Sequence, residues 1–208
     1  MCNEYEQQIA YAAYCRMMQD LELGMPTQQT ELDLPLAARV AITDVAPVMR
    51  AAGNVVELAQ MRFSFPPPKP GGKPVFNYRS EGRRFDKTNR CVIPASAFFE
   101  YQGERSPKSK YRITLNDAPI LGIAGIWREG KGDAPSAFSM LTVDPGPDIA
   151  AYHDRQIVIL QPKDWFAWLG LTKPQDDLLR PLPAGFLTVE TIRKGRDWPH
   201  GRPVNGGG

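Results

Sequence analysis

The residue pair with the most distinctive chemistry stands at the start of the chain, where Cys2 follows Met1 directly. Aminopeptidases remove an initiator Met when the next side chain is as small as that of Cys, and a processed chain would begin with Cys2. Its α-amine would be roughly a tenth neutral at pH 7, and its thiol a few per cent thiolate. Such a 1,2-aminothiol condenses with an aldehyde to an imine, which the thiol then closes to a thiazolidine ring. The alternative at this position is a loose and unused terminus.

A second set of candidates lies in the segment 76–81. Asn77 and Arg79 are two residues apart, so on an extended segment their side chains share one face. An Asn amide can hold a substrate oxygen, and an Arg guanidinium can hold a phosphate. The alternative is an edge strand whose polar side chains face water.

Two titratable residues stand in apolar surroundings. Glu100 falls in the aromatic run 97–101 and shares a face with Phe98 by the two-residue period of a strand. A buried carboxyl has a raised pKa, which suits a general acid or base near neutral pH; the alternative is a position on the solvent face. His153 precedes the apolar run 157–160 and could transfer protons near pH 7, or it could be a hydrogen-bonded structural residue.

A run of basic residues extends beyond Arg79 and includes Arg83, Arg84, Lys87 and Arg90. Phosphate contacts need such a local excess of positive charge. A solvated loop is the ordinary alternative for a run of this kind.

These residues must be positioned by one compact domain, because 208 residues with 42% hydrophobic and 23% charged side chains can enclose a single core. Three cysteines without a C-x-x-C pair and two histidines predict neither a disulfide framework nor a metal site. No apolar run approaches the roughly 20 residues of a membrane helix. No secretory leader is evident. We therefore expect a cytosolic protein without a membrane partner.

The hydrophobic pattern predicts an α+β fold. Apolar residues recur every four positions from 4 to 21, which predicts a helix that holds Cys2 in place. Strands are expected at 45–51 and 55–62, joined by a turn at Gly53-Asn54, and the proline-rich stretch 65–72 is expected to be an exposed loop. Further short strands are expected from 75 to 160 and at 186–192, with helices at 162–169 and 175–180. The sum is mainly antiparallel sheet with peripheral helices.

Taken in order, these motifs resemble those of the SOS response-associated peptidase (SRAP) family, which crosslinks abasic sites. They are Met-Cys at 1–2, Val-Ala-Pro at 45–47, Asn-x-Arg at 77–79, Arg-Cys-Val-Ile-Pro-Ala at 90–95, Phe-Phe-Glu-Tyr at 98–101 and His-Asp-Arg at 153–155. The resemblance implies a bent, partly barrel-like antiparallel sheet with peripheral helices. It implies an SRAP domain at 1–193 and a flexible tail at 194–208.

The resemblance also implies a function. A protein of this family binds single-stranded DNA that contains an abasic site. After the protein has removed its own Met1, it forms a covalent thiazolidine crosslink through Cys2. We expect a crosslinking or lyase activity with a peptidase-type processing step. We expect no cofactor and no metal, a monomer, and a cytoplasmic protein associated with the nucleoid.

Particular residues match the family's functional positions. Asn77 matches the residue that orients the sugar and the cysteine backbone, and Glu100 matches the acid that assists proton transfer in ring opening and closure. His153 matches the residue that acts in imine chemistry and in reversal of the crosslink.

Four further residues are expected to contact DNA. Arg79 and Arg155 match positions that grip phosphates, and Pro47 falls where a turn is expected to press against DNA beside the lesion. Many relatives carry Trp-Gly shortly before the Asn motif. Phe63 stands near that place and is expected to stack on a base.

Two other functions fit the same residues. The α-amine of Cys2 could act as the base on its own thiol in a peptidase or amidohydrolase. The chain could also be a non-catalytic single-stranded DNA-binding module in which Cys2 has no role.

Overall fold

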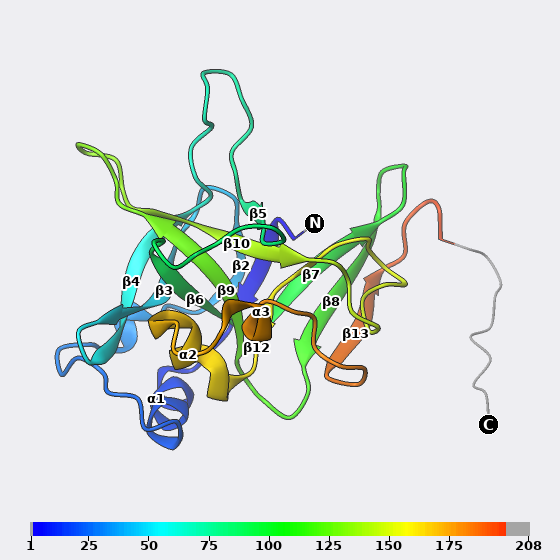
Figure 1. The fold of residues 1–208 in the computed structure, drawn as a ribbon. Coiled ribbons are helices and arrows are strands. Elements are labelled where there is room, and N and C mark those ends of the chain that lie inside the picture. The colour runs from blue at the N-terminus through cyan, green and yellow to red at the C-terminus, as the bar shows by residue number, and fades with distance from the viewer. Residues whose placement is uncertain (1, 199–208) are drawn as a thin grey trace.

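The structure is a computed structural model that describes residues 2–198, and it consists of two β-sheets with short helices around them (Figure 1). The strands are β1 (Glu4–Gln7), β2 (Ala37–Ala41), β3 (Val45–Ala52), β4 (Val55–Phe63), β5 (Asn77–Arg79), β6 (Arg90–Ala95), β7 (Ala97–Gln102), β8 (Ser109–Leu115), β9 (Leu121–Arg128), β10 (Ala137–Val143), β11 (Gln156–Ile157), β12 (Ile159–Leu160) and β13 (Leu187–Arg193). The helices are α1 (Tyr11–Asp20), η1 (Glu31–Asp33), η2 (Pro162–Asp164), α2 (Trp165–Gly170) and α3 (Gln175–Leu178).

The larger sheet closes on itself. Its strands follow the order β11-β10-β4-β3-β6-β9-β12, and β10 also pairs with β9, so β10, β4, β3, β6 and β9 form a ring. Most pairings are antiparallel, and β10 runs parallel to β4 and to β5. The predicted fold, α+β with a partly barrel-like antiparallel sheet, is confirmed.

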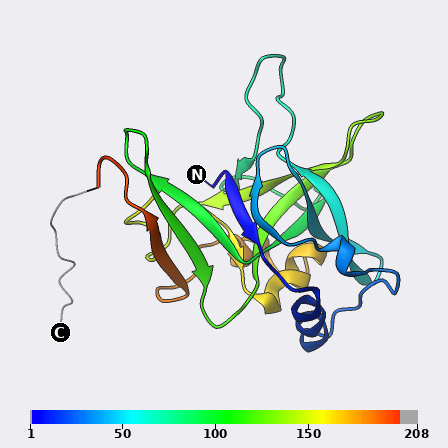
Figure 2. The same ribbon diagram turned by 180° about the vertical axis from the view of Figure 1, so that it is seen from behind.

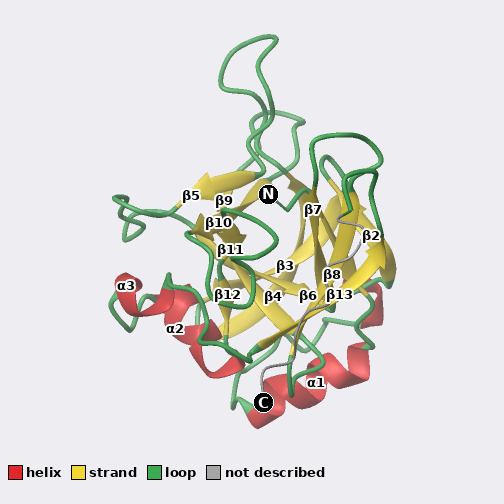
Figure 3. Cartoon of the chain, turned by 90° about the vertical axis from the view of Figure 1, so that its right-hand side faces the viewer, coloured by secondary structure: helices red, strands yellow, loops and turns green. Residues whose placement is uncertain are grey.

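The smaller sheet has the order β13-β8-β7-β1-β2 and carries the N-terminus. Figure 2 shows β1 in the middle of the molecule, with β7 and β8 on one side and β2 on the other. A cluster of buried side chains, which includes Cys2, Tyr5, Phe98 and Phe138, joins this sheet to the ring. The helices gather at the opposite end of the molecule from the N-terminus (Figure 3).

The β3–β4 hairpin and helix α2 form where the sequence predicts them. Gly53 adopts a φ of 63° in the turn between β3 and β4, a conformation that favours glycine. Pro162 begins the segment that leads into α2, where a missing N–H is tolerated. Trp165 of α2 packs against Gly122 so closely that a Cβ there would lie 2.2 Å from the indole nitrogen.

The helix predicted for residues 4–21 is wrong over its first part. Residues 4–7 form β1, and the helix begins at Tyr11. β1 pairs with β7 on one side and β2 on the other, and these tertiary pairings outweigh the four-residue periodicity of a short segment. Cys2 is therefore held by a strand between two neighbours.

The turn that the resemblance implied at Pro47 is also wrong, because Pro47 lies buried within β3, the strand predicted at 45–51. The turn falls just before it, at Ile42-Thr43. β3 pairs with β6 only at Met49, so one side of the strand has little pairing near Pro47, which is where a proline is tolerated.

The chain beyond β13 is described as far as Trp198. Within this stretch Asp197 Oδ2 accepts bonds from the N–H groups of Glu104 and Arg105, at 2.9 and 2.7 Å. Met1, with its predicted removal, and residues 199–208 of the predicted tail lie outside the described residues. Between residues 2 and 198, no helix has the length and apolar character required to cross a membrane.

Candidate functional site

The candidate site is built around Cys2, which is fully buried immediately before β1. Its thiol donates to the backbone oxygen of Glu4 at 3.2 Å. Tyr5 pairs with Phe98 across the antiparallel β1–β7 ladder. The continuation of β7 towards Glu100 therefore runs beside the residues that precede Tyr5.

Asn77 connects a distant segment to Cys2. It is the first residue of β5, which pairs with β10. Its side-chain Nδ2 donates to the backbone oxygen of Cys2 at 2.8 Å. Its Oδ1 is buried and accepts no hydrogen bond from any described residue, so it remains available to a ligand.

Glu100 is fully buried on the inner face of β7, beside Phe98. Burial raises the pKa of its carboxyl from 4.5 to about 7. The predicted burial of this carboxyl is therefore confirmed. A group with this pKa can give or accept a proton near neutral pH.

His153 lies on the loop before β11, with its Nε2 3.9 Å from Oε2 of Glu100. Its Nδ1 lies 3.0 Å from the backbone N–H of Arg155 and 2.8 Å from Oδ1 of Asp154. A neutral imidazole cannot both accept and donate at Nδ1. We assign the backbone bond to the neutral form, because burial lowers the pKa of His153 and the side chain of Asp154 is 89% exposed. Nε2 then carries the proton and faces Glu100.

The thiol of Cys2 is neutral in this environment. Burial raises its pKa, the nearby charge of Glu100 raises it further, and the backbone amides of Phe99 and Glu4 oppose the shift only in part. The sulfur can therefore add to an electrophile only as a base removes its proton. Glu100, whose charge acts on this thiol, is a titratable group placed to take it, and His153 lies 3.9 Å from Glu100.

The structure brings together Cys2, Asn77, Glu100 and His153. It places the two arginines that were predicted to bind phosphate in different environments. Arg79 lies exposed on β5, two residues from Asn77. Arg155 is buried, and its guanidinium already bonds to Glu81 and Asp144.

The base-stacking role predicted for Phe63 does not fit its position. Phe63 is fully buried at the end of β4, with its ring stacked on Phe138 at a centroid distance of 5.1 Å and in edge contact with Tyr5. The alternation of β4 turns this side chain inward. The ring packs against Tyr5 and Phe138 in the interior, so it has no exposed surface on which a nucleobase could stack.

The sequence analysis missed the group that anchors β1, which we call the Glu4 cluster: Glu4, Arg39, Tyr101 and Lys110. Glu4 is 5% exposed and contacts Arg39 Nε at 2.7 Å, the hydroxyl of Tyr101 and the ammonium of Lys110. Carboxylates two residues apart, at positions 4 and 6, share a face on a strand but not on a helix, and this spacing is the signal in the sequence that favours a strand.

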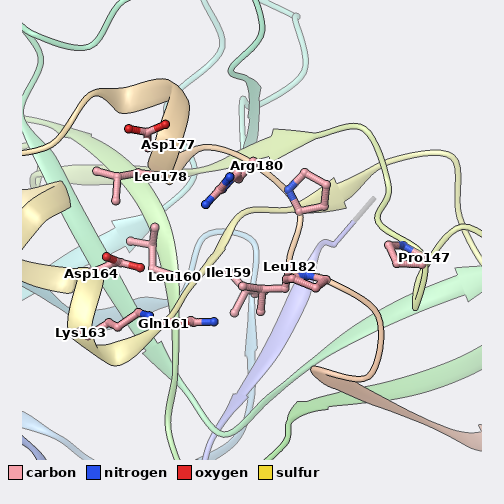
Figure 4. A pocket seen from close by; sticks show the side chains of 12 residues that line it. Pro147, Ile159, Leu160, Gln161, Lys163, Asp164, Asp177, Leu178, Arg180 and Leu182 are labelled. Atoms are coloured by element: carbon pink, nitrogen blue, oxygen red, sulfur yellow. The ribbon is translucent and has the colours of Figure 1, made fainter.

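The described residues hold no cluster of three or more metal-ligating side chains. A cavity of about 450 Å³ lies between the 159–164 segment and the 177–183 segment. Gln161, Lys163, Arg180 and Leu182 are among the residues that line it (Figure 4). None of the four residues gathered at Cys2 lines it.

Comparisons with known proteins match the chain to one family. The sequence profile described as SOS response associated peptidase (SRAP) matches residues 1–195. The abasic site processing protein YobE of Bacillus subtilis (strain 168) is 30% identical over 100 residues, which cover 46% of this chain and 45% of YobE. YoaM, an abasic site processing protein of the same organism, is 27% identical over 145 residues, 62% of this chain and 64% of YoaM. The chain thus matches about half to two thirds of the length of these relatives.

Solved structures share the fold. A protein from Bordetella bronchiseptica superposes with a TM-score of 0.70 at 23% identity, covering 92% of this chain and 100% of that one. A protein from Bacteroides thetaiotaomicron gives a TM-score of 0.68 at 19% identity, covering 92% of both chains. At these identities the likeness establishes the architecture alone.

Proposed function

Because the chain belongs to the SOS response associated peptidase (SRAP) family, we propose that it processes abasic sites in DNA through a covalent bond to Cys2. The substrate is single-stranded DNA, the protein acts as a monomer in the cytoplasm at the nucleoid, and no cofactor takes part. Residues 1–193 form the functional domain. The names of the abasic site processing proteins that match the chain support the substrate class.

The observation that carries the proposal is the convergence of three distant segments, those of Asn77, Glu100 and His153, on Cys2. Asn77 bonds to the Cys2 carbonyl at 2.8 Å, and His153 Nε2 lies 3.9 Å from the buried carboxyl of Glu100. Burial raises the pKa of Glu100 to about 7, so it can serve as acid in one step and base in the next.

The proposed reaction begins with the abasic sugar, which is mostly a closed hemiacetal. Glu100 and His153 move a proton from the hemiacetal hydroxyl to the ring oxygen, and the aldehyde forms. Once Met1 has been removed, the amine of Cys2 attacks the aldehyde carbon and the imine forms with loss of water. The thiol then adds to the imine carbon. Both hydrogens of the amine leave in that water, and the proton of the thiol ends on the ring nitrogen.

Each side chain has a role in these steps. Asn77 holds the Cys2 backbone, and its buried Oδ1 accepts a hydrogen bond from the sugar. Arg79, exposed on the same strand, binds a phosphate next to the lesion. A nucleotide that lacks its nucleobase requires little free energy to leave the stacked strand. The covalent bond gives the complex a lifetime that a few phosphate contacts do not provide.

The proposal is tested by incubating the protein with a single-stranded oligonucleotide that carries one abasic site. We expect a band that survives denaturing electrophoresis, with an intact mass equal to the two components minus one water. Cys2→Ala should remove the band, whereas Cys15→Ala, at a half-buried cysteine on α1, should leave it. A crosslink of equal yield with Cys2→Ala would refute the role of Cys2.

Removal of Met1 is proposed as a reaction of the site on its own chain. Intact mass separates this from removal by an aminopeptidase. If the site removes Met1, Glu100→Gln should retain it, because the proton donor is lost. If an aminopeptidase removes Met1, Glu100→Gln should still lose it, because the small side chain at position 2 is unchanged. A Glu100→Gln chain that lacks Met1 would show that the site is not needed for processing.

A further inference from the structure

Arg155 is held by its own protein on several sides. Its guanidinium forms a two-pronged ion pair with Glu81, at 2.6 and 2.8 Å, and bonds to Asp144 at 2.5 Å and Thr142 at 3.2 Å. The side chain of Arg155 is only 8% exposed. A charge paired in this way is a structural connection that holds its partners in fixed geometry.

This ion-pair group, which we call the Arg155 clamp (Glu81, Asp144 and Arg155), joins three segments. Glu81 follows β5, Asp144 follows β10 and Arg155 precedes β11. Glu81 Oε1 also accepts the backbone N–H of Asp144 at 3.0 Å. Because β5 carries Asn77, the clamp connects the segment that holds the Cys2 carbonyl to the segment that carries His153.

The clamp reaches His153 through one peptide group. The backbone N–H of Arg155 donates to Nδ1 of His153 at 3.0 Å. This bond selects the neutral tautomer with its proton on Nε2, the nitrogen that faces Glu100. Movement of the Arg155 backbone would lengthen this hydrogen bond, and the tautomer with its proton on Nδ1 would then also be populated.

The charges of the clamp argue against phosphate binding. One guanidinium faces two carboxylates, so the group carries a net charge of −1 and would repel a phosphate. Arg79 on the neighbouring strand has no such partner among the described residues and is exposed. Arg79 and Arg155, which the sequence motifs predict to have the same role, therefore differ in what they can bind.

We propose that Glu81 and Arg155 are positioning residues that fix the orientation and tautomer of His153, and that Arg155 does not bind DNA phosphate. The catalytic consequence rests on the proposed function, whereas the tautomer does not. The two roles of Arg155 predict opposite effects for one substitution, Glu81→Gln. If Arg155 binds phosphate, loss of the competing carboxylate should strengthen DNA binding. If Arg155 positions His153, DNA binding should change little and the chemistry should slow.

The first measurement uses the free protein. The chain has only two histidines, His153 and His200, so long-range proton–nitrogen NMR spectra can be assigned with one His200→Gln variant. We expect wild type to show the Nε2-protonated tautomer for His153 and Glu81→Gln to show a mixture of both tautomers. An unchanged tautomer in Glu81→Gln would overturn the proposal.

The second measurement follows crosslinking to abasic single-stranded DNA as a function of DNA concentration. For Glu81→Gln we expect the maximal rate to fall about tenfold, since a misplaced proton donor loses part of the 100-fold or larger benefit of general acid–base catalysis. The half-saturating concentration should stay within about twofold, because no phosphate contact is lost. Tighter DNA binding with an unchanged maximal rate would assign Arg155 to phosphate.

Controls separate positioning from general stability. Glu57→Gln breaks another ion pair, to Arg50 at 2.6 Å on the β3–β4 hairpin, and should leave the rate and the tautomer as in wild type. Glu81→Asp keeps the charge and should recover part of the rate; no recovery would contradict the ion-pair role. If wild type forms no crosslink, the proposed function fails, and the NMR result alone decides on the Arg155 clamp.

Discussion

Replacement of Glu4 by Gln tests whether the Glu4 cluster holds the N-terminal strand. The substitution keeps the size of the side chain and removes its charge. Glu4 is the common partner of Arg39, Tyr101 and Lys110, which come from β2, β7 and β8. Loss of its charge therefore weakens the attachment of β1, two residues from Cys2, to three other strands of the same sheet.

The size of the effect follows from the pKa of Glu4. Burial alone would raise it, but the bonds from Arg39, Lys110 and Tyr101 outweigh burial and lower it from 4.5 to about 2. That difference corresponds to an upper value of about 3 kcal/mol in the free energy of unfolding. Gln still accepts one hydrogen bond, so we expect a loss of about 2 kcal/mol, or a decrease of about 4–8 °C in Tm for a chain of this length.

Thermal unfolding of wild type and Glu4→Gln at several pH values is the assay. Because the folded-state pKa lies below the unfolded value, the carboxylate stabilises the fold fully above about pH 4.5 and progressively less as the pH falls towards 2. The difference in Tm should thus be largest at pH 7 and should shrink in acid. Glu57→Gln, at a more exposed ion pair, should cost under about 1 kcal/mol. Equal Tm values for wild type and Glu4→Gln at pH 7 would refute the anchoring role.

Three further outcomes are expected. Glu100→Gln should slow crosslinking yet stabilise the fold at pH 8 by about 1–3 kcal/mol. Burial raises the pKa of Glu100 to about 7, so the native carboxyl stabilises the fold fully below about pH 4.5 and loses that contribution as the pH rises through 7. Unfolding in urea at about pH 5 and about pH 8 checks both the sign and the pH range of this effect. Arg79→Glu should weaken binding to single-stranded DNA and reduce the slope of log K against log salt by about 1 or more, measured by fluorescence anisotropy; an unchanged slope would remove Arg79 from the phosphate contacts. Phe63→Leu should cost about 1–2 kcal/mol of stability and leave DNA affinity within about twofold, because the ring is buried against Phe138; a selective loss of affinity would restore the base-stacking interpretation.

Local patterns were sufficient to predict much of the fold. The β3–β4 hairpin follows from alternation and from Gly53, and the burial of Glu100 follows from its position on the same strand face as Phe98. These features depend on neighbours within a few residues, where side-chain direction is set by the backbone.

The errors occurred where distant segments decide the outcome. Glu4 and Glu6 lie in a strand because β2 and β7 pair with it, and their side chains form ion pairs with Lys110 and Arg112, more than 100 residues later. The motif Asn-x-Arg and the motif His-Asp-Arg each contain an arginine, but only the fold reveals that Glu81 and Asp144 neutralise Arg155 and leave Arg79 exposed. Neither charge pairing nor burial of this kind can be obtained from spacing along the chain.

The position of β1 between β2 and β7 also sets an order of events during synthesis. Glu4 and Tyr101 are 97 residues apart, so the ribosome needs roughly 5–20 s after releasing the first strand before its partner exists. During that interval residue 2 is accessible to any enzyme, and after docking it is fully enclosed. A chain refolded from denaturant with Met1 still attached would have no such interval for an aminopeptidase, and only a reaction within the folded molecule could then expose the amine.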